Sequence, residues 1–161
     1  INEMPDGSLF ALLRSEDGNG GSDNAPLYRA RSEDRGVTWS RPTVFNDRGV
    51  WPQLLTLESG VTLASYGRPG LFLRATRDPS GRQWDPRMTL IDPGVDTPHT
   101  NTHTCAYSGL IALSDTRALL VYSEFKYPDE QGRPCKTLLS RYIDTKFTER
   151  GYNTNRCGTA Q

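Results

Sequence analysis

Residues 32–39 read Ser-Glu-Asp-Arg-Gly-Val-Thr-Trp, the pattern S-x-D-x-G-x-T-W that is known as an Asp-box. Four of its positions suit a tight turn, namely Ser32, Asp34, Gly36 and Trp39. An Asp side chain accepts hydrogen bonds from nearby backbone N–H groups, and Gly adopts the positive φ with which a chain doubles back. A large Trp ring then anchors the turn against its neighbours. The motif therefore predicts a hairpin corner, whose residues are expected to serve architecture and not catalysis.

A looser copy of the box follows at residues 76–84, Thr-Arg-Asp-Pro-Ser-Gly-Arg-Gln-Trp, with one inserted residue before its glycine. Its turn residues are Asp78, Gly81 and Trp84. The two aspartates are 44 residues apart, and the two tryptophans are 45 apart. A fixed period of this size is typical of repeat architectures, four-stranded propeller blades among them. Because one such unit cannot bury both faces of its sheet alone, several copies must assemble the fold.

The rest of the chain alternates short apolar runs with turn residues. It holds 15 Gly and 11 Pro, and no stretch keeps a helical period over ten or more positions. Strands are expected at 9–14, 27–31, 43–46, 53–57, 61–66, 71–76, 88–91, 104–113, 118–125 and 137–143. Loops are expected at 15–26, 92–103 and 126–134. We therefore predict an all-β fold, a β-propeller of four-stranded antiparallel blades.

The length of the chain bounds the number of blades. Dividing 161 residues by a period of 45 gives about 3.6 repeats, or three to four blades. A propeller typically has about 4–8 blades, so the chain is expected to be a fragment of a longer propeller, whose remainder is then its partner. We assign residues 1–145 to the partial propeller and the polar residues 146–161 to a C-terminal tail.

Charge and hydropathy exclude several kinds of partner. Lys+Arg and Asp+Glu number 19 each, so the net charge is zero and nothing predicts nucleic-acid binding. No run of about 18 apolar residues exists, so no membrane span is predicted, and no signal peptide is visible. Among the basic residues only Lys126, Lys136 and Lys146 are lysines. Arginine suits bidentate carboxylate binding, although a general compositional bias would produce the same excess.

The cysteines and histidines give no firm site. Cys105, Cys135 and Cys157 are an odd number and define no disulfide framework, although one pair, such as Cys135 with Cys157, is compatible with the sequence. His99 and His103 have an H-x-x-x-H spacing, but their Thr-rich segment follows a proline and lacks the helical geometry of a zinc site. We expect these histidines to line a cleft, and we predict no metal and no cofactor.

Three segments around the boxes resemble the exo-α-sialidases (neuraminidases), which are six-bladed propellers. Residues 3–14 (EMPDGSLFALLR) are similar to the family's E-L-P-D-G-x-L-x-x-x-x-R, and residues 68–74 (RPGLFLR) to its R-x-x-L-x-x-R. Residues 105–122 begin CAYSGL and end LLVY, similar to A-Y-S-x-L…L-L-Y-E. The order and spacing of the segments also fit. The resemblance covers residues 1 to about 145 and implies the C-terminal half or so of a sialidase catalytic domain.

The resemblance also implies roles for individual residues. Tyr107 matches the family's nucleophile, and Arg14 and Arg68 match the second and third of three arginines that bind the carboxylate of sialic acid. The chemistry is consistent, because guanidinium groups bind carboxylates bidentately and a neutral phenol is not repelled by the substrate's own charge. A phenol with an ordinary pKa of about 10 needs a base beside it. The family's glutamate base, aspartate acid/base and first arginine are expected upstream of Ile1.

Glu124 is a further candidate for the substrate site. In the family a Glu directly follows the Tyr and braces an arginine, whereas here one residue separates Tyr122 from Glu124. On a strand, a shift by one residue turns the side chain to the other face, unless a bulge restores its direction.

The expected activity is retaining hydrolysis of terminal α-linked sialic acids from glycoconjugates, with sialylated glycans as substrates. Such glycans lie mostly on cell surfaces and secreted glycoproteins, so the resemblance implies a secreted or cell-surface protein, in a bacterium periplasmic or extracellular. The isolated chain is expected to have little or no activity. One alternative is a non-catalytic Asp-box propeller that binds carbohydrate or protein, because fold does not fix function. Another is a hydrolase of a different glycan that puts the arginines to another use.

Overall fold

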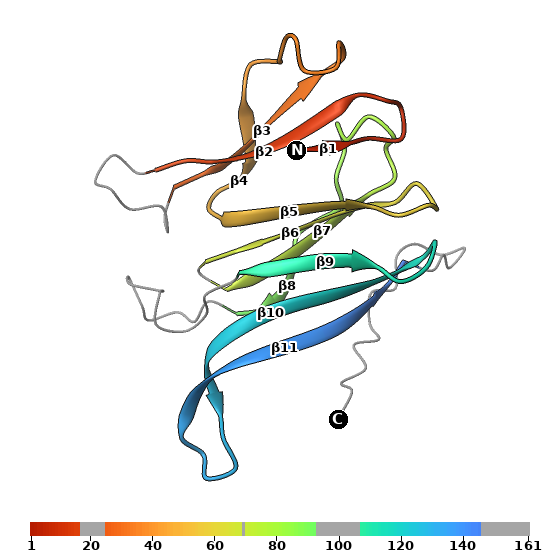
Figure 1. Ribbon diagram of the computed structural model, residues 1–161. Helices are drawn as coiled ribbons and strands as arrows, with labels where there is room; N and C mark the ends of the chain where they lie inside the picture. The colour runs from red at the N-terminus through yellow and green to blue at the C-terminus, as the bar shows by residue number, and fades with distance from the viewer. Residues whose placement is uncertain (17–24, 69, 93–106, 146–161) are drawn as a thin grey trace.

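The computed structural model describes residues 1–16, 25–68, 70–92 and 107–145, and within these ranges it consists of strands and turns without a helix (Figure 1). The fold is therefore all-β, as the sequence predicted. No helix in the described ranges is long and apolar enough to cross a membrane. The predicted tail 146–161 and most of the predicted loop 92–103 lie outside the described residues.

The strands form three antiparallel sheets that follow one another along the chain. The first sheet contains β1 (Asn2–Glu3), β2 (Leu9–Arg14), β3 (Leu27–Ser32) and β4 (Thr43–Asn46). The second contains β5 (Val50–Thr56), β6 (Thr62–Gly67), β7 (Leu71–Thr76) and β8 (Met88–Ile91). The third contains β9 (Ser108–Ala112), β10 (Arg117–Pro128) and β11 (Pro134–Asp144). Each sheet is a meander, because every strand pairs with the next one along the chain.

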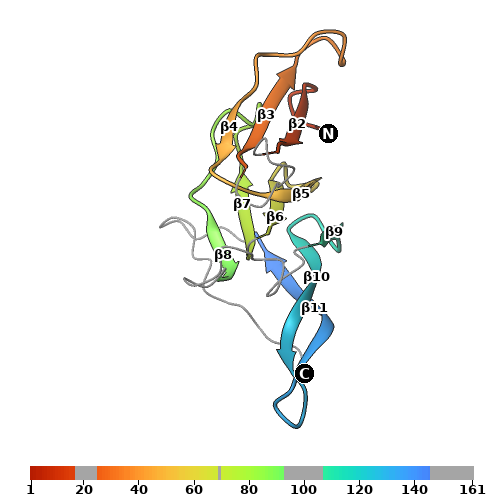
Figure 2. The ribbon, with the colours of Figure 1, turned by 90° about the vertical axis from the view of Figure 1, so that its left-hand side faces the viewer.

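The first strands of the three sheets are neighbours. β5 lies beside β1 on one side and beside β9 on the other (Figure 1), and Figure 2 also shows β5 next to β9. Within the described residues the three sheets do not close into a ring. The propeller and its number of blades therefore stay a prediction.

The first and second sheets repeat the same turn between their first two strands. Residues 4–8 and residues 57–61 each form a five-residue turn, in which the first backbone N–H donates to the last carbonyl at 2.8 Å. The fourth residues, Gly7 and Gly60, have φ angles of 80° and 81°. Glycine reaches this conformation without steric cost, which explains its place in both turns. The repeat therefore extends beyond the two boxes from which the sequence inferred it.

The hydrophobic core lies between consecutive sheets. Between the first two it is built from aromatic rings whose centroids are 5.2–6.3 Å apart, those of Phe10, Phe45, Tyr66, Phe72 and Trp84. Between the second and third sheets it is mainly aliphatic, with Leu63, Leu71, Leu73, Leu120 and Tyr122 among its members. Each sheet thus buries a face that it could not bury alone.

The predicted loop at 126–134 is confirmed at 129–133 and was wrong at both of its ends. β10 continues to Pro128 and β11 starts at Pro134, and these two residues are cross-strand partners. The carboxylate of Asp129 accepts two backbone N–H groups of the turn, at 2.8 and 2.9 Å, and so closes the hairpin. Prolines and charges indicated a loop, but pairing with the partner strand decides the conformation here.

Candidate functional site

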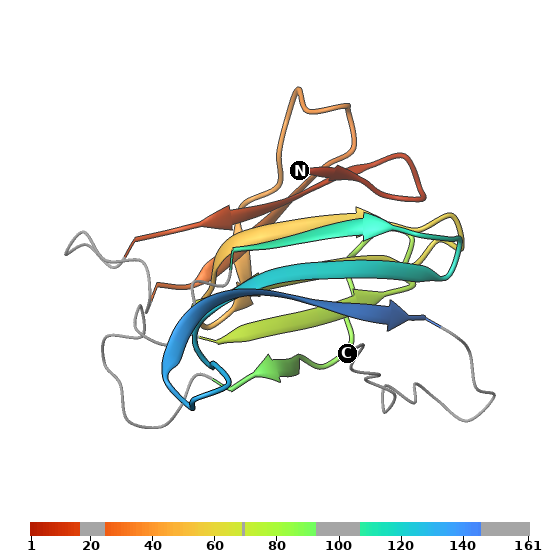
Figure 3. The same ribbon diagram turned by 60° about the horizontal axis from the view of Figure 1, so that its bottom comes forward.

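Three predicted site residues lie at one end of the sheets. Arg14 ends β2, Arg68 directly follows β6, and Tyr107 directly precedes β9. Figures 1 and 3 show the end of β2, the start of β5 and the start of β9 on the same side of the molecule. Each residue comes from a different sheet, so the topology alone brings them to a common end.

The turn after β6 presents Arg68 in an unusual conformation. Its φ is 53°, and its backbone N–H donates to the carbonyl of Gly70 at 3.1 Å. The left-handed conformation costs about 1–2 kcal/mol for a residue with a side chain. A residue keeps such a conformation only where surrounding interactions hold it there, and residues of this kind cluster at functional sites. The partly buried Arg68 is thus a candidate on conformational grounds as well as on its chemistry.

Trp51, which was not predicted as a site residue from the sequence, lies at the same end. β5 begins at Val50, three residues before the expected start at Gln53, because a bulge falls between these two residues. Within the bulge, Trp51 has a φ of 50° and is 49% exposed. Its ring meets that of Tyr107 edge to face, with centroids 4.9 Å apart and an interplanar angle of 76°. The sequence around Trp51 does not distinguish it from an ordinary packing residue, because the bulge depends on pairing with β6 and the ring contact depends on the position of β9.

Tyr107 is fixed through the residue that follows it. The hydroxyl groups of Ser108 and Ser65 hydrogen-bond at 2.9 Å, and both side chains are buried. Ser65 lies on β6, two residues before its end at Gly67. This bond therefore holds the start of β9 over the last residues of β6, close to the turn that carries Arg68. The Tyr107 side chain itself is 47% exposed.

Glu124 lies on β10 and is partly buried. Its pairing with β11 is continuous from Arg117 to Glu124, and the only shift in that register falls between Glu124 and Tyr127. The bulge therefore lies beyond Glu124 and does not separate it from Tyr122. Because no bulge separates them, Glu124 lies on the same face of the strand as Tyr122. In the sialidase pattern the Glu directly follows the Tyr and lies on the opposite face, so the side-chain direction of Glu124 differs from that pattern.

The first box is a compact corner held by its own side chains. The carboxylate of Asp34 accepts hydrogen bonds from the Thr38 hydroxyl at 2.5 Å, and from the Thr38 N–H and the Ser32 hydroxyl at 2.8 Å each. The Ser32 hydroxyl accepts from the N–H of Gly36, whose carbonyl accepts from the Trp39 indole. The hydrogen bonds from Thr38 and Ser32 lower the pKa of Asp34 to about 2.

The second box repeats this construction. The carboxylate of Asp78 accepts from the Ser80 hydroxyl at 2.6 Å and from the Gln83 N–H at 2.8 Å. The indole N–H of Trp84 donates to the carbonyl of Gly81 at 2.8 Å. The first box follows the end of β3, and the second follows the end of β7. The other end of β3 pairs with Arg14, and the other end of β7 pairs with Gly67, next to Arg68. Both boxes therefore stand at the end of the sheets away from Tyr107.

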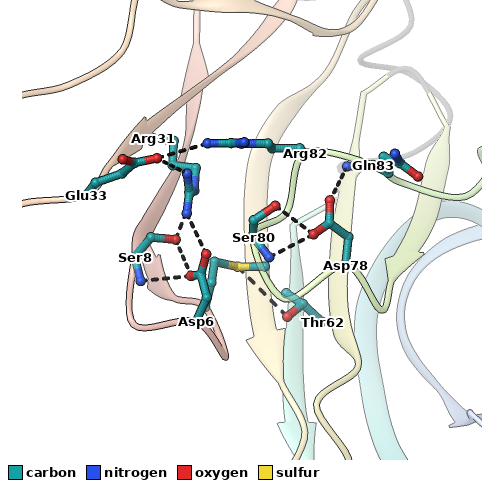
Figure 4. Close-up of polar contacts among 10 residues, drawn as sticks. Asp6, Ser8, Arg31, Glu33, Thr62, Asp78, Ser80, Arg82 and Gln83 are labelled. Carbon is teal, nitrogen blue, oxygen red and sulfur yellow. Dashed lines mark hydrogen bonds and ion pairs between the residues drawn. The ribbon is translucent and has the colours of Figure 1, made fainter.

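An ion-pair network connects the two boxes (Figure 4). The guanidinium of Arg31 on β3 pairs with Asp6 at 2.5 Å and also with Glu33. Glu33 accepts in addition from Arg82 of the second box, at 3.0 Å. The network joins the first turn of the chain to both corners, which indicates a structural use for these arginines.

The described residues contain no group of three or more His, Cys, Asp or Glu that could hold a metal ion. His99 and His103 lie outside these residues, as do Cys105 and Cys157. Cys135 is a free thiol, and its Sγ lies 3.1 Å from the carbonyl of Tyr127.

The fold defines an all-β protein of successive antiparallel meanders with a candidate site at one end. No protein-family model matches the chain, and no curated protein matches it significantly. Its fold is similar to the crystal structure of a protein of unknown function from Dyadobacter fermentans, with a TM-score of 0.63 and 20% sequence identity. The match covers 90% of this chain and 37% of that chain, so this chain spans little more than a third of that protein. At this identity the likeness concerns the fold alone.

Proposed function

We propose that the chain is part of the catalytic domain of a retaining exo-sialidase with a propeller fold. The proposal rests on one observation: Arg14, Arg68 and Tyr107, from three consecutive sheets, share one end of the molecule. The blade arrangement is supported by the neighbouring first strands, because the inner strands of propeller blades surround a common axis.

The chemistry assigns a separate task to each group. The guanidinium groups of Arg14 and Arg68 bind the carboxylate of a terminal sialic acid. The phenol oxygen of Tyr107, after loss of its proton to a base, bonds to the anomeric carbon, while the glycosidic bond breaks and the leaving oxygen takes up a proton from an acid. Water then attacks the same carbon and releases the sugar. Two displacements at one centre retain its configuration.

The test is turnover of a fluorogenic α-sialoside by the full-length protein that contains this chain. Replacing Tyr107 by Phe keeps the ring and its contact with Trp51, and turnover is expected to fall to background. Tyr142→Phe is the matched control, because Tyr142 is also 47% exposed but lies on β11. Normal activity of the Tyr107 variant contradicts the proposal. Binding of free sialic acid without turnover by the wild type favours the non-catalytic glycan-binding module instead.

A further inference from the structure

Trp51 combines three features that ordinary packing does not explain. Its φ is 50°, its side chain is 49% exposed, and its ring contacts that of Tyr107. Half-exposed side chains gain little from burial, so burial of the indole does not account for the strained backbone. The positive φ belongs to the bulge in β5, and the described aromatic ring that the exposed indole contacts is that of Tyr107.

The bulge in β5 determines where the indole points. Val50 is 1% exposed and pairs with Gly67, so it belongs to the core. Regular pairing resumes at Gln53. The bulge between them re-aims the intervening Trp51 toward the start of β9, as bulges next to functional sites do.

The phenol of Tyr107 needs such a neighbour. Its backbone is tied down through Ser108, but its side chain is 47% exposed and can turn about two torsions. Within the described part of the chain, the indole of Trp51 is the one aromatic ring in contact with it. Edge-to-face contact restricts the rotamer of the phenol, because the attraction depends on the angle between the rings.

We propose that Trp51 is a positioning residue that fixes the orientation of the Tyr107 phenol. Its role in the reaction rests on the proposed function, whereas its control of the Tyr107 ring does not. Trp51 acts through the nucleophile, so its loss lowers kcat and leaves KM unchanged. The expected decrease in kcat for Trp51→Ala is about 2- to 10-fold, which corresponds to about 0.4–1.4 kcal/mol.

The experiment uses the full-length protein labelled with 3-fluorotyrosine, with the Tyr107 signal assigned by its loss in Tyr107→Phe. Trp51→Ala is expected to shift that fluorine signal and to lower kcat at constant KM. Trp51→Phe restores both in large part, because a ring is again present. Trp39→Phe is the control, since Trp39 is 37% exposed but lies in the first box, and it should change neither.

Two results would overturn the positioning role. One is an unchanged Tyr107 signal in Trp51→Ala. The other is a rise in KM at constant kcat, which would make Trp51 a substrate contact. A wild-type protein that neither binds nor cleaves sialosides refutes the proposed function, and the fluorine signal alone then decides whether Trp51 orients Tyr107.

Discussion

The indole of Trp51 and the phenol of Tyr107 meet edge to face at 4.9 Å, although Trp51 belongs to the second sheet and Tyr107 adjoins the third. The contact joins the bulge of β5 to the start of β9, at the end of the molecule that also holds the Arg68 turn. The candidate site therefore lies at a junction between sheets, and its geometry depends on how the sheets pack.

Arg68→Lys is expected to weaken substrate binding while leaving the fold intact. Lysine keeps the charge but cannot bind a carboxylate with two parallel hydrogen bonds. A hydrogen bond to a charged group contributes about 1.5–3 kcal/mol, so we expect KM for a sialoside to rise about 10-fold or more. Steady-state kinetics measures this change. Arg82→Lys, in the second box, is the control, and an equal effect of the two substitutions would contradict a role for Arg68 in binding.

Asp34 is expected to contribute to acid sensitivity. Its folded pKa of about 2 lies below the ordinary value of 3.8, so the ionised form is favoured by folding. The contribution is present above about pH 4 and is lost as the pH falls toward 2. Tm measured between pH 5 and pH 2 should fall less steeply in Asp34→Asn than in the wild type. An unaltered slope in Asp34→Asn would be evidence against this account.

Gly49→Ala is expected to destabilise the protein by about 1–3 kcal/mol through overpacking. A Cβ at Gly49 would lie 2.9 Å from a ring carbon of Tyr66, and φ there is 152°. Tyr66 is fully buried and cannot move aside. Urea unfolding gives the loss in free energy. The control is Gly109→Ala, because a Cβ at Gly109 would have no atom within 4 Å, and a similar loss in both variants would exclude the steric explanation.

The two box tryptophans are expected to differ in their contribution to stability. Trp84 packs against Phe10 and Phe45, with centroids 5.4 and 5.2 Å away, whereas Trp39 is 37% exposed. Trp84→Ala should cost about 3–5 kcal/mol, and Trp39→Ala clearly less. Urea unfolding of both variants measures the difference. Equal losses would show that each Trp ring stabilises the protein through its own turn and not through packing between the sheets.

Most strands and both boxes could be predicted from the sequence, because their signals are local. Turn residues such as Gly7 and Gly60 indicate hairpins, and Asp34 hydrogen-bonds to residues no more than four positions away. The bulge at Trp51 and the extension of β10 to Pro128 were missed, since both depend on the register with another strand.

The amino-acid order was enough to indicate the repeated boxes, their turns and the residue types at the candidate site. That Arg14, Arg68 and Tyr107 share one end, and that Trp51 touches Tyr107, follows from the packing of the sheets. The difference lies in the sequence separation over which each interaction acts. Turn chemistry acts between residues a few positions apart, whereas the packing of one sheet on the next joins positions more than fifty residues apart, and no local pattern encodes that contact.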